Sequence, residues 1–181
     1  MLSLKKNLLQ QISNAPTKDV YFFDEARFGT HSKLGHGWFE KGSRTGVNCK
    51  LGFKNFYMYS AINPKTGEDL SIILDKVNTT SFNVFLDEFS KQLGPKEVLF
   101  VMDNASWHKS KELIVPINIQ IVYLPPYSPE LNPVERFWEY IKSKTIRNKI
   151  YKSINDLYSY LVNFYNSLDL DTIKSICNYG Y

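Results

Sequence analysis

The chain has 181 residues, of which 43% are hydrophobic and 22% are charged, and its formal net charge is +4. This length predicts one domain, and the hydrophobic fraction excludes a disordered, collagen-like or coiled-coil protein. No apolar run is long enough to span a membrane. Residues 1–15 lack the apolar stretch of a secretory signal, because polar residues interrupt it. Two cysteines are too few for a disulfide framework, and we therefore expect a cytoplasmic protein.

The positive charge is concentrated in residues 26–54 and 136–152, each with a local net charge of +5. The rest of the chain is acidic. Two basic segments around an acidic remainder suit a polyanionic partner. Two solvated surfaces are the alternative, and charge alone does not decide between them.

The hydrophobic pattern predicts strands first, and then strands that alternate with helices. Strands are expected over residues 20–23, 56–62, 70–74, 98–102 and 117–123. A glycine-rich loop is expected over residues 26–46. Helices are expected over residues 79–93, capped by Thr79 or Thr80 and ended by Gly94, from Pro133 onward, and over residues 155–168. Continuous apolar strands among helices predict an α/β fold, a mixed sheet with helices on both faces that resembles ribonuclease H.

Two aspartates follow predicted buried strands directly. Asp24 follows residues 20–23, and Asp103 follows residues 98–102. If the two strands are neighbours, the carboxylates meet at one edge of the sheet, where their oxygens suit Mg²⁺ or Mn²⁺. The alternative is that each aspartate is a turn residue or a helix cap.

A third acid stands at the start of the predicted helix that Pro133 opens. Asn132 suits the N-cap, and Glu135 falls at the third helical position. The spacing is that of a capping box, which is a purely structural role. A carboxylate in the first helical turn is also kept ionised by the helix dipole, which suits a metal ligand. Spacing does not decide between these roles.

Three segments together resemble a known family. Residues 22–29 (FFDEARFG), 101–108 (VMDNASWH) and 124–135 (LPPYSPELNPVE) resemble the three blocks of a DDE transposase, of the bacterial insertion-sequence branch of the Tc/mariner superfamily. The resemblance implies a ribonuclease H-like catalytic domain over residues 18–181, with residues 1–17 as an amino-terminal helix and linker. It also implies that Asp24, Asp103 and Glu135 are the catalytic acids and hold two Mg²⁺ ions, for which Mn²⁺ substitutes. Glu130 is the alternative third acid.

The resemblance implies a reaction as well. One ion activates a water or a DNA 3′-hydroxyl, and the other stabilises the leaving oxygen, so that DNA is cut at element ends and joined to target DNA. Asp24 is the expected ligand of both ions. A ribonuclease H-like nuclease or resolvase without strand transfer is one alternative, and an inactive truncated transposase that binds only DNA or a partner is another.

Other residues are expected to support these acids or to bind DNA. Asn104 and His108 lie in the second block, where His108 either orders phosphate or water near the metal ions or lies on the face or at the cap of a helix. Glu25 points to the opposite face from Asp24 if the strand continues, and it has either a structural role or a supporting role beside the acids. Asp69 and Asp75 match no block and are expected at the surface. The residues expected to contact DNA are basic: Arg27, Lys33, Lys41, Arg44, Arg136, Lys142 and Lys144.

The expected partners are double-stranded DNA and a second transposase molecule. Relatives carry helix-turn-helix modules ahead of the catalytic domain, and the segment before the first predicted strand has room for one helix and a linker. We therefore expect a homodimer or a complex with a full-length transposase.

Overall fold

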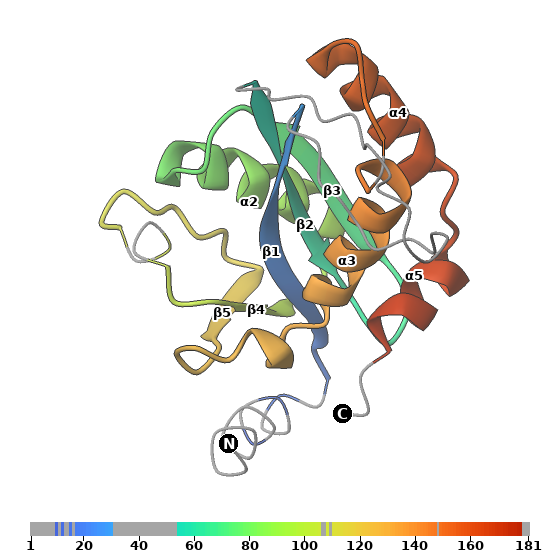
Figure 1. Ribbon diagram of the computed structural model, residues 1–181. Coiled ribbons are helices and arrows are strands. Elements are labelled where there is room, and N and C mark those ends of the chain that lie inside the picture. Colours follow the sequence, from blue (N-terminus) through green and yellow to red (C-terminus); the bar gives the residue numbers. More distant parts are fainter. Residues whose placement is uncertain are drawn as a thin grey trace.

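A five-stranded mixed sheet runs through the centre of the molecule, with helices on both of its faces (Figure 1). The computed structural model describes residues 10, 12, 15, 17–30, 54–105, 108, 110–147 and 149–178. The strands are β1 (Asp19–Gly29), β2 (Asn55–Ile62), β3 (Asp69–Leu74), β4 (Val98–Met102) and β5 (Ile119–Tyr123), in the order β3-β2-β1-β4-β5. Neighbouring strands are antiparallel from β3 to β1 and parallel from β1 to β5.

Strand β1 is longer than its apolar run. The sequence predicts a strand over residues 20–23 that ends at Asp24, and the structure shows that this end is wrong. Residues 19–22 pair with β4, and residues 22–29 then pair with β2, whose hydrogen bonds carry the strand on to Gly29. Asp24 is therefore an interior residue of β1. The remainder of the predicted glycine-rich loop, from residue 31 to residue 46, lies outside the described residues.

Helix α2 (Thr79–Leu93) covers one face of the sheet. Its buried stripe packs against β1, β2 and β4, and consists of Phe82, Phe85, Leu86, Phe89 and Leu93. The bounds of this helix are as predicted, but its cap is not. Asn78 caps the helix, because its side-chain oxygen accepts a hydrogen bond of 2.8 Å from the Ser81 amide. Gly94 ends the helix with a φ of 60°, a conformation that glycine adopts without a steric penalty.

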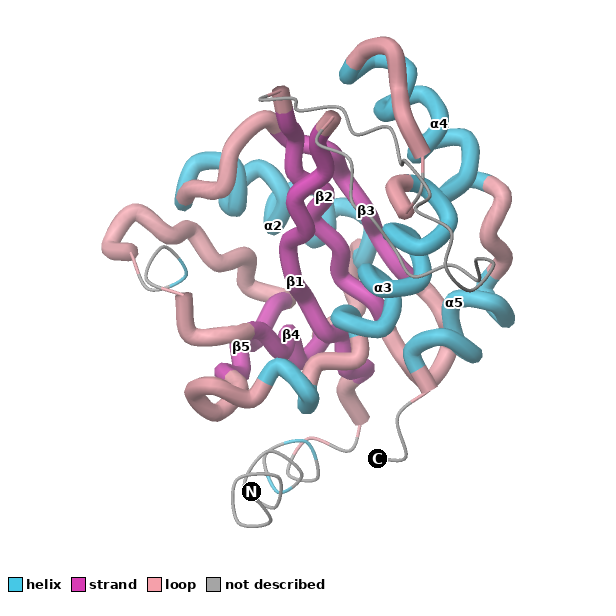
Figure 2. The backbone as a smooth tube through the Cα atoms, in the orientation of Figure 1, coloured by secondary structure: helices cyan, strands magenta, loops and turns pink. Residues whose placement is uncertain are grey.

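The other face carries three helices, α3 (Val134–Thr145), α4 (Ile154–Asn166) and α5 (Leu170–Cys177) (Figure 2). A 3-10 turn, η2 (Pro129–Leu131), precedes α3. The sequence predicts one last helix over residues 155–168 and no α5. Helix α4 ends at Asn166, and Asp169 then caps a new helix. Its side chain accepts a hydrogen bond of 2.7 Å from the Thr172 amide.

Strand β1 divides its side chains between the two faces. Tyr21 and Phe23 pack against α2, whereas Phe22, Ala26 and Phe28 pack against α3 and its neighbours. Because strand side chains alternate, Asp24 lies on the α3 side and Glu25 on the α2 side. This alternation determines the surroundings of both acids.

The two acids that match no block differ from one another. Asp75 is exposed, as expected, but Asp69 is half-buried, and its placement at the surface is wrong. Its Oδ2 atom accepts hydrogen bonds from the hydroxyls of Tyr165, at 2.5 Å, and Ser71, at 3.3 Å, because α4 lies over β3. In the part of the chain that the structure describes, no helix is both long and apolar enough to cross a membrane.

Candidate active site

Parallel pairing of β1 with β4 brings Asp24 and Asp103 level with one another. The pair Phe22 and Val101 is the last that the two strands share, and each aspartate comes two residues after it. Strand β4 then ends at Met102, whereas β1 continues beside β2. Asp103 therefore lies at the carboxyl end of its strand, and Asp24 lies beside it within a longer strand.

The carboxylate of Asp24 is held from the α3 side. The indole Nε1 atom of Trp138 donates a hydrogen bond of 2.9 Å to Asp24 Oδ2. Trp138 comes one turn after Glu135 on α3, so one face of this helix carries both the indole and the third acid.

The carboxylate of Asp103 is held by its own loop. Its Oδ1 atom accepts hydrogen bonds from the Ala105 amide, at 3.0 Å, and from His108 Nδ1, at 2.9 Å. The other ring nitrogen of His108, Nε2, lies 3.0 Å from Glu25 Oε1. Asn104 donates from its side chain to the Leu124 carbonyl, which ties this loop to the segment before η2.

Asn132 fixes the start of α3 against β1. Its side-chain nitrogen donates a hydrogen bond of 2.9 Å to the Phe23 carbonyl, and its side-chain oxygen accepts one of 3.1 Å from the Val134 amide. The helix begins at Val134 with Pro133 at the cap, so Glu135 is its second residue and not its third. The backbone N–H of Asn132 donates a hydrogen bond of 2.8 Å to the Pro129 carbonyl. This bond replaces the one that the predicted capping box would make to the Glu135 side chain.

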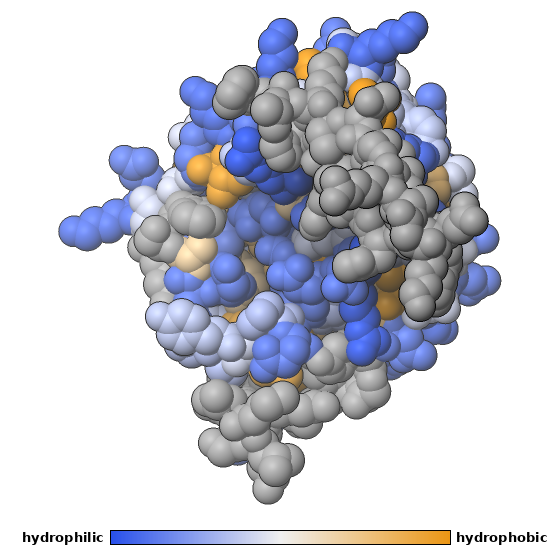
Figure 3. All heavy atoms as spheres, viewed as in Figure 1, coloured by the Kyte–Doolittle hydropathy of each residue, from blue (hydrophilic) through white to orange (hydrophobic). Residues whose placement is uncertain are grey.

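Asp24, Asp103 and Glu135 line one cleft of about 430 Å³. Its remaining wall comes from Asn104, Ala105, Asn132 and the proline-rich segment 124–129. Glu130 does not line this cleft, but lines a neighbouring hollow with Glu135 and Glu139. Because it lines the cleft, Glu135 fits the position of a third acid better than Glu130. On the face shown in Figure 3, hydrophilic residues gather over the middle of the molecule, and apolar patches are small.

Residues 19–158 match the family model described as DDE superfamily endonuclease. The chain belongs to this DDE endonuclease family. The matched residues include all three acids of the cleft and both strands that place the first two.

Three curated proteins are similar in sequence to parts of this DDE endonuclease. An uncharacterised protein of Sinorhizobium fredii, y4pE/y4sA, is 33% identical over 114 residues, which are 62% of this chain and 84% of that protein. The 39 kDa protein of insertion element IS630 from Shigella sonnei is 25% identical over 134 residues, 71% of this chain and 39% of that protein. The Tc3 transposase of Caenorhabditis elegans is 25% identical over 169 residues, 87% of this chain and 51% of that protein. The chain thus spans about half or less of the latter two.

The fold is similar to that of the Mos1 transposase. A Mos1 paired-end complex with the left transposon end superimposes with a TM-score of 0.73 at 16% identity, over 97% of this chain and 56% of that chain. A Mos1 paired-end complex with Mn gives a TM-score of 0.71 over 96% of this chain. The fold is therefore ribonuclease H-like, as the sequence predicts.

The electrostatics of the DDE endonuclease cleft differ between its acids. Burial, with the negative charges of Glu135 and Glu25, raises the pKa of Asp24 to about 8. The hydrogen bond from His108 lowers the pKa of Asp103. Burial also raises the pKa of Glu135, although the positive charge of Lys142 opposes this shift. Burial and neighbouring carboxylates thus disfavour the ionised forms of Asp24 and Glu135.

The donor set of the cleft fits a divalent cation. Three carboxylates provide the oxygen atoms that Mg²⁺ and Mn²⁺ prefer, and a bound cation would offset the burial and the repulsion that raise the pKa of Asp24. Among the described residues, no three His, Cys, Asp or Glu side chains come close enough together to hold a metal ion. One oxygen each of Asp24 and Asp103 is instead turned to a ring nitrogen. The assignment of the three acids as metal ligands stays a prediction.

The predicted DNA-contacting residues that the structure describes do not share one surface. Lys142 lies on the face of α3 that carries Glu135, because seven residues complete two helical turns. Arg136 is about 100° away around the helix and donates a hydrogen bond of 2.9 Å to the Asn178 carbonyl after α5. Lys144 packs over the Tyr140 ring. Arg27 is exposed, and the alternation of strand side chains places it on the α2 face of β1. Lys33, Lys41 and Arg44 lie outside the described residues.

Sequence reasoning misses three contributors to this site. It places Trp138 on the buried face of its helix without the bond to Asp24, assigns Asn132 only a capping role, and does not connect Glu25 with His108. Both Asn132 and Trp138 belong to the third block or follow it closely, but their partners on β1 are more than 100 residues away. The side chain of His108 is 1% exposed and lies between the carboxylates of Asp103 and Glu25.

Proposed function

We propose that this DDE endonuclease catalyses DNA transposition, cutting phosphodiester bonds at the ends of an element and transferring the ends into target DNA. The observation that carries the proposal is that Asp24, Asp103 and Glu135 line one cleft of a ribonuclease H-like fold. The similarity to IS630 and Tc3 proteins supports transposition over other phosphodiester chemistry. The Mos1 structures with Mn and with Mg support a divalent cofactor.

Asp24, Asp103 and Glu135 would hold two divalent cations, with Asp24 as the ligand of both. When bound, such ions activate the attacking water or 3′-hydroxyl and stabilise the leaving oxygen. The protein's own contribution is to fix the three carboxylates on two strands and a helix. Asn132 bonds β1 to the start of α3, so Glu135 cannot shift relative to Asp24 without breaking a buried hydrogen bond.

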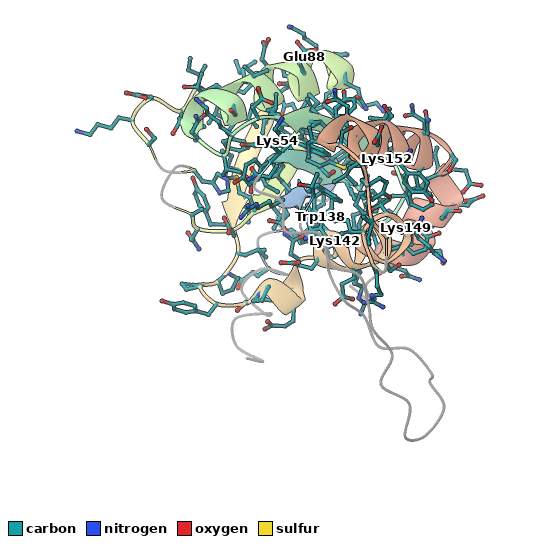
Figure 4. The ribbon with its side chains drawn as sticks, turned by 45° about the horizontal axis from the view of Figure 1, so that its top comes forward. Lys54, Glu88, Trp138, Lys142, Lys149 and Lys152 are labelled. Atoms are coloured by element: carbon teal, nitrogen blue, oxygen red, sulfur yellow. The ribbon has the colours of Figure 1, made fainter. Side chains whose placement is uncertain are left out.

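We expect double-stranded DNA to approach the cleft along the α3 face. Lys142 stands beside Trp138 there (Figure 4) and is placed to neutralise a phosphate next to the acids. A second transposase molecule, either another copy or a full-length protein, is the proposed protein partner. The solved Mos1 paired-end complexes support an assembly of this kind.

Nicking of supercoiled plasmid tests the proposal. With Mg²⁺ or Mn²⁺, the wild-type protein is expected to nick the plasmid, and Asp103→Ala is expected to abolish nicking. Asp75→Ala is the matched control, because Asp75 is an exposed aspartate outside the cleft. Wild-type nicking that persists in Asp103→Ala contradicts the proposed site.

Strand transfer is measured separately from nicking. Labelled element ends joined covalently to a target plasmid are the expected product. Metal-dependent nicking without any joined product would identify a nuclease or resolvase in place of a transposase. A folded wild-type protein that binds DNA but neither nicks nor joins it would identify an inactive relative.

A further inference from the structure

Asp24 and Asp103 are each hydrogen-bonded to an aromatic ring nitrogen, from opposite faces of the sheet. Trp138 reaches Asp24 Oδ2 from the α3 side, at 2.9 Å. His108 reaches Asp103 Oδ1 from the α2 side, at 2.9 Å, where its ring contacts those of Phe23 and Phe82 with centroids 5.8 and 4.8 Å apart. Both rings are buried. Each carboxylate therefore has one oxygen fixed by a rigid side chain.

His108 lies between two carboxylates. Its Nδ1 atom lies 2.9 Å from Asp103 Oδ1, and its Nε2 atom lies 3.0 Å from Glu25 Oε1. The side chains of His108 and Glu25 are only 1% and 7% exposed. The imidazole ring is therefore enclosed and held at both of its nitrogens.

Glu25 is connected to Asp103 through His108. It lies on the α2 face of β1, the opposite face from Asp24, and it does not line the cleft. A role as a direct metal ligand therefore does not fit its position. Its geometry is that of an outer carboxylate that orients an imidazole, which in turn orients a carboxylate of the site.

We propose that Glu25 and His108 are positioning residues that hold Asp103 Oδ1 through a Glu25–His108–Asp103 chain, as Trp138 holds Asp24 Oδ2, so that the second oxygen of each aspartate is presented to a divalent cation. This inference rests on the proposed function. It assigns roles to Glu25 and Trp138, neither of which is one of the three acids of the cleft. It also predicts that a residue outside the cleft controls metal affinity.

Mn²⁺ binding to the full chain tests the inference without DNA cleavage, with free Mn²⁺ counted by electron paramagnetic resonance. Glu25→Gln keeps an oxygen for His108, but an amide oxygen accepts a weaker hydrogen bond than a carboxylate does, so the ring is held less firmly. We expect its Mn²⁺ affinity to fall by about 10-fold or more. Glu139→Gln is the matched control, because it removes a negative charge close to Glu135 without a contact in the chain of bonds. Its affinity should remain close to that of the wild type.

A second pair of variants separates orientation from folding. His108→Asn places an amide N–H where Nδ1 lies and keeps the bond to Asp103, whereas His108→Gln places it where Nε2 lies and loses that bond. We expect His108→Asn to bind Mn²⁺ more tightly than His108→Gln. Circular dichroism spectra and melting temperatures show whether each variant is folded.

The outcomes distinguish the inference from the proposed function. If Glu25→Gln binds Mn²⁺ as tightly as Glu139→Gln, or if His108→Gln binds better than His108→Asn, the positioning chain is wrong and the proposed function stands. If the wild type has no saturable Mn²⁺ site, or Asp103→Asn leaves binding unchanged, the proposed metal site is wrong and the inference fails with it.

Discussion

A single amide side chain fixes the distance between two parts of the site. Asn132 is 5% exposed and bonds both the Phe23 carbonyl of β1 and the Val134 amide of α3. Asn132→Ala leaves a buried carbonyl and a helix amide without these partners, and we expect a loss of about 1–3 kcal/mol in the free energy of unfolding. Denaturant titration measures this loss. Asn155→Ala, at an exposed position of α4, is the control and should change stability by less than about 0.5 kcal/mol. Equal losses in the two variants would show that the Asn132 bonds contribute nothing.

Tyr127 adopts a backbone conformation that suits glycine. Its φ is 56° and its side chain is 101% exposed at the edge of the cleft. A tyrosine in this left-handed region carries a steric cost of roughly 1 kcal/mol, and its ring buries no surface in return. We expect Tyr127→Gly to raise the melting temperature slightly, with a gain of up to about 0.5 kcal/mol after the greater entropy of unfolded glycine is counted. Tyr127→Ala removes the ring but keeps the strain, so it should give no gain. A gain in both variants would attribute the effect to the ring.

Asp69 makes stability depend on pH. Burial raises the pKa of its carboxyl above the value in the unfolded chain. The folded state therefore binds the proton more tightly, and the stability due to Asp69 is greatest below the unfolded pKa of about 3.9 and is lost as the pH rises through the folded pKa. Asp69→Asn keeps an oxygen for the Tyr165 hydroxyl and does not ionise. Relative to the wild type, its melting temperature should rise as the pH increases from about 4 to about 7. Parallel curves for the two proteins would contradict this expectation.

At the scale of the element, hydrophobic periodicity predicts which residues pack in the core, and strand pairing decides where a strand ends. The stripe of α2 and the apolar run of β4 give bounds that match the structure, because burial and length coincide in both. Strand β1 is different, since its second half carries Asp24, Glu25 and Arg27 and is a strand only because β2 lies beside it. Helix α5 is short, and it is absent from the prediction because the last predicted helix ends at residue 168, directly before the N-cap Asp169.

The same distinction explains how much of the candidate site the sequence predicts. The three acids are predicted because each belongs to a local block with its own pattern. The groups that hold them depend on contacts between elements that are far apart in the chain, such as the bond from Trp138 to Asp24. The reach of Glu25 to His108 also depends on β1 continuing past Asp24, which the apolar pattern does not predict. Tertiary pairing of this kind leaves no local sequence signal.

At the scale of the whole molecule, the proposed function requires the acid cleft to accept DNA, and the position of the nearby lysines would decide the direction of approach. Figure 4 shows Lys142 next to Trp138 on α3, with Glu88 far away on α2. Lys142 Nζ lies 5.8 Å from the centroid of the Phe28 ring, on the α3 side of β1. Lys91 lies on the other side of the sheet and pairs with Asp87 and Glu88 at 2.7 Å. A duplex at the cleft would meet the first lysine and not the second.

Charge reversal at these two lysines tests the direction from which DNA approaches. Each contacted phosphate contributes a slope of about −0.9 to the dependence of log K on log salt concentration. Lys142→Glu is expected to weaken binding to duplex DNA and to reduce the magnitude of that slope by about 1. Lys91→Glu makes the same change in net charge on the α2 face and should leave both quantities nearly unchanged. Fluorescence anisotropy across a salt series measures affinity and slope together. If both variants weaken binding equally, net charge governs affinity, and DNA does not approach along α3. If Lys142→Glu alone loses affinity and slope, the phosphate next to the three acids is held by the helix that also carries Glu135 and Trp138.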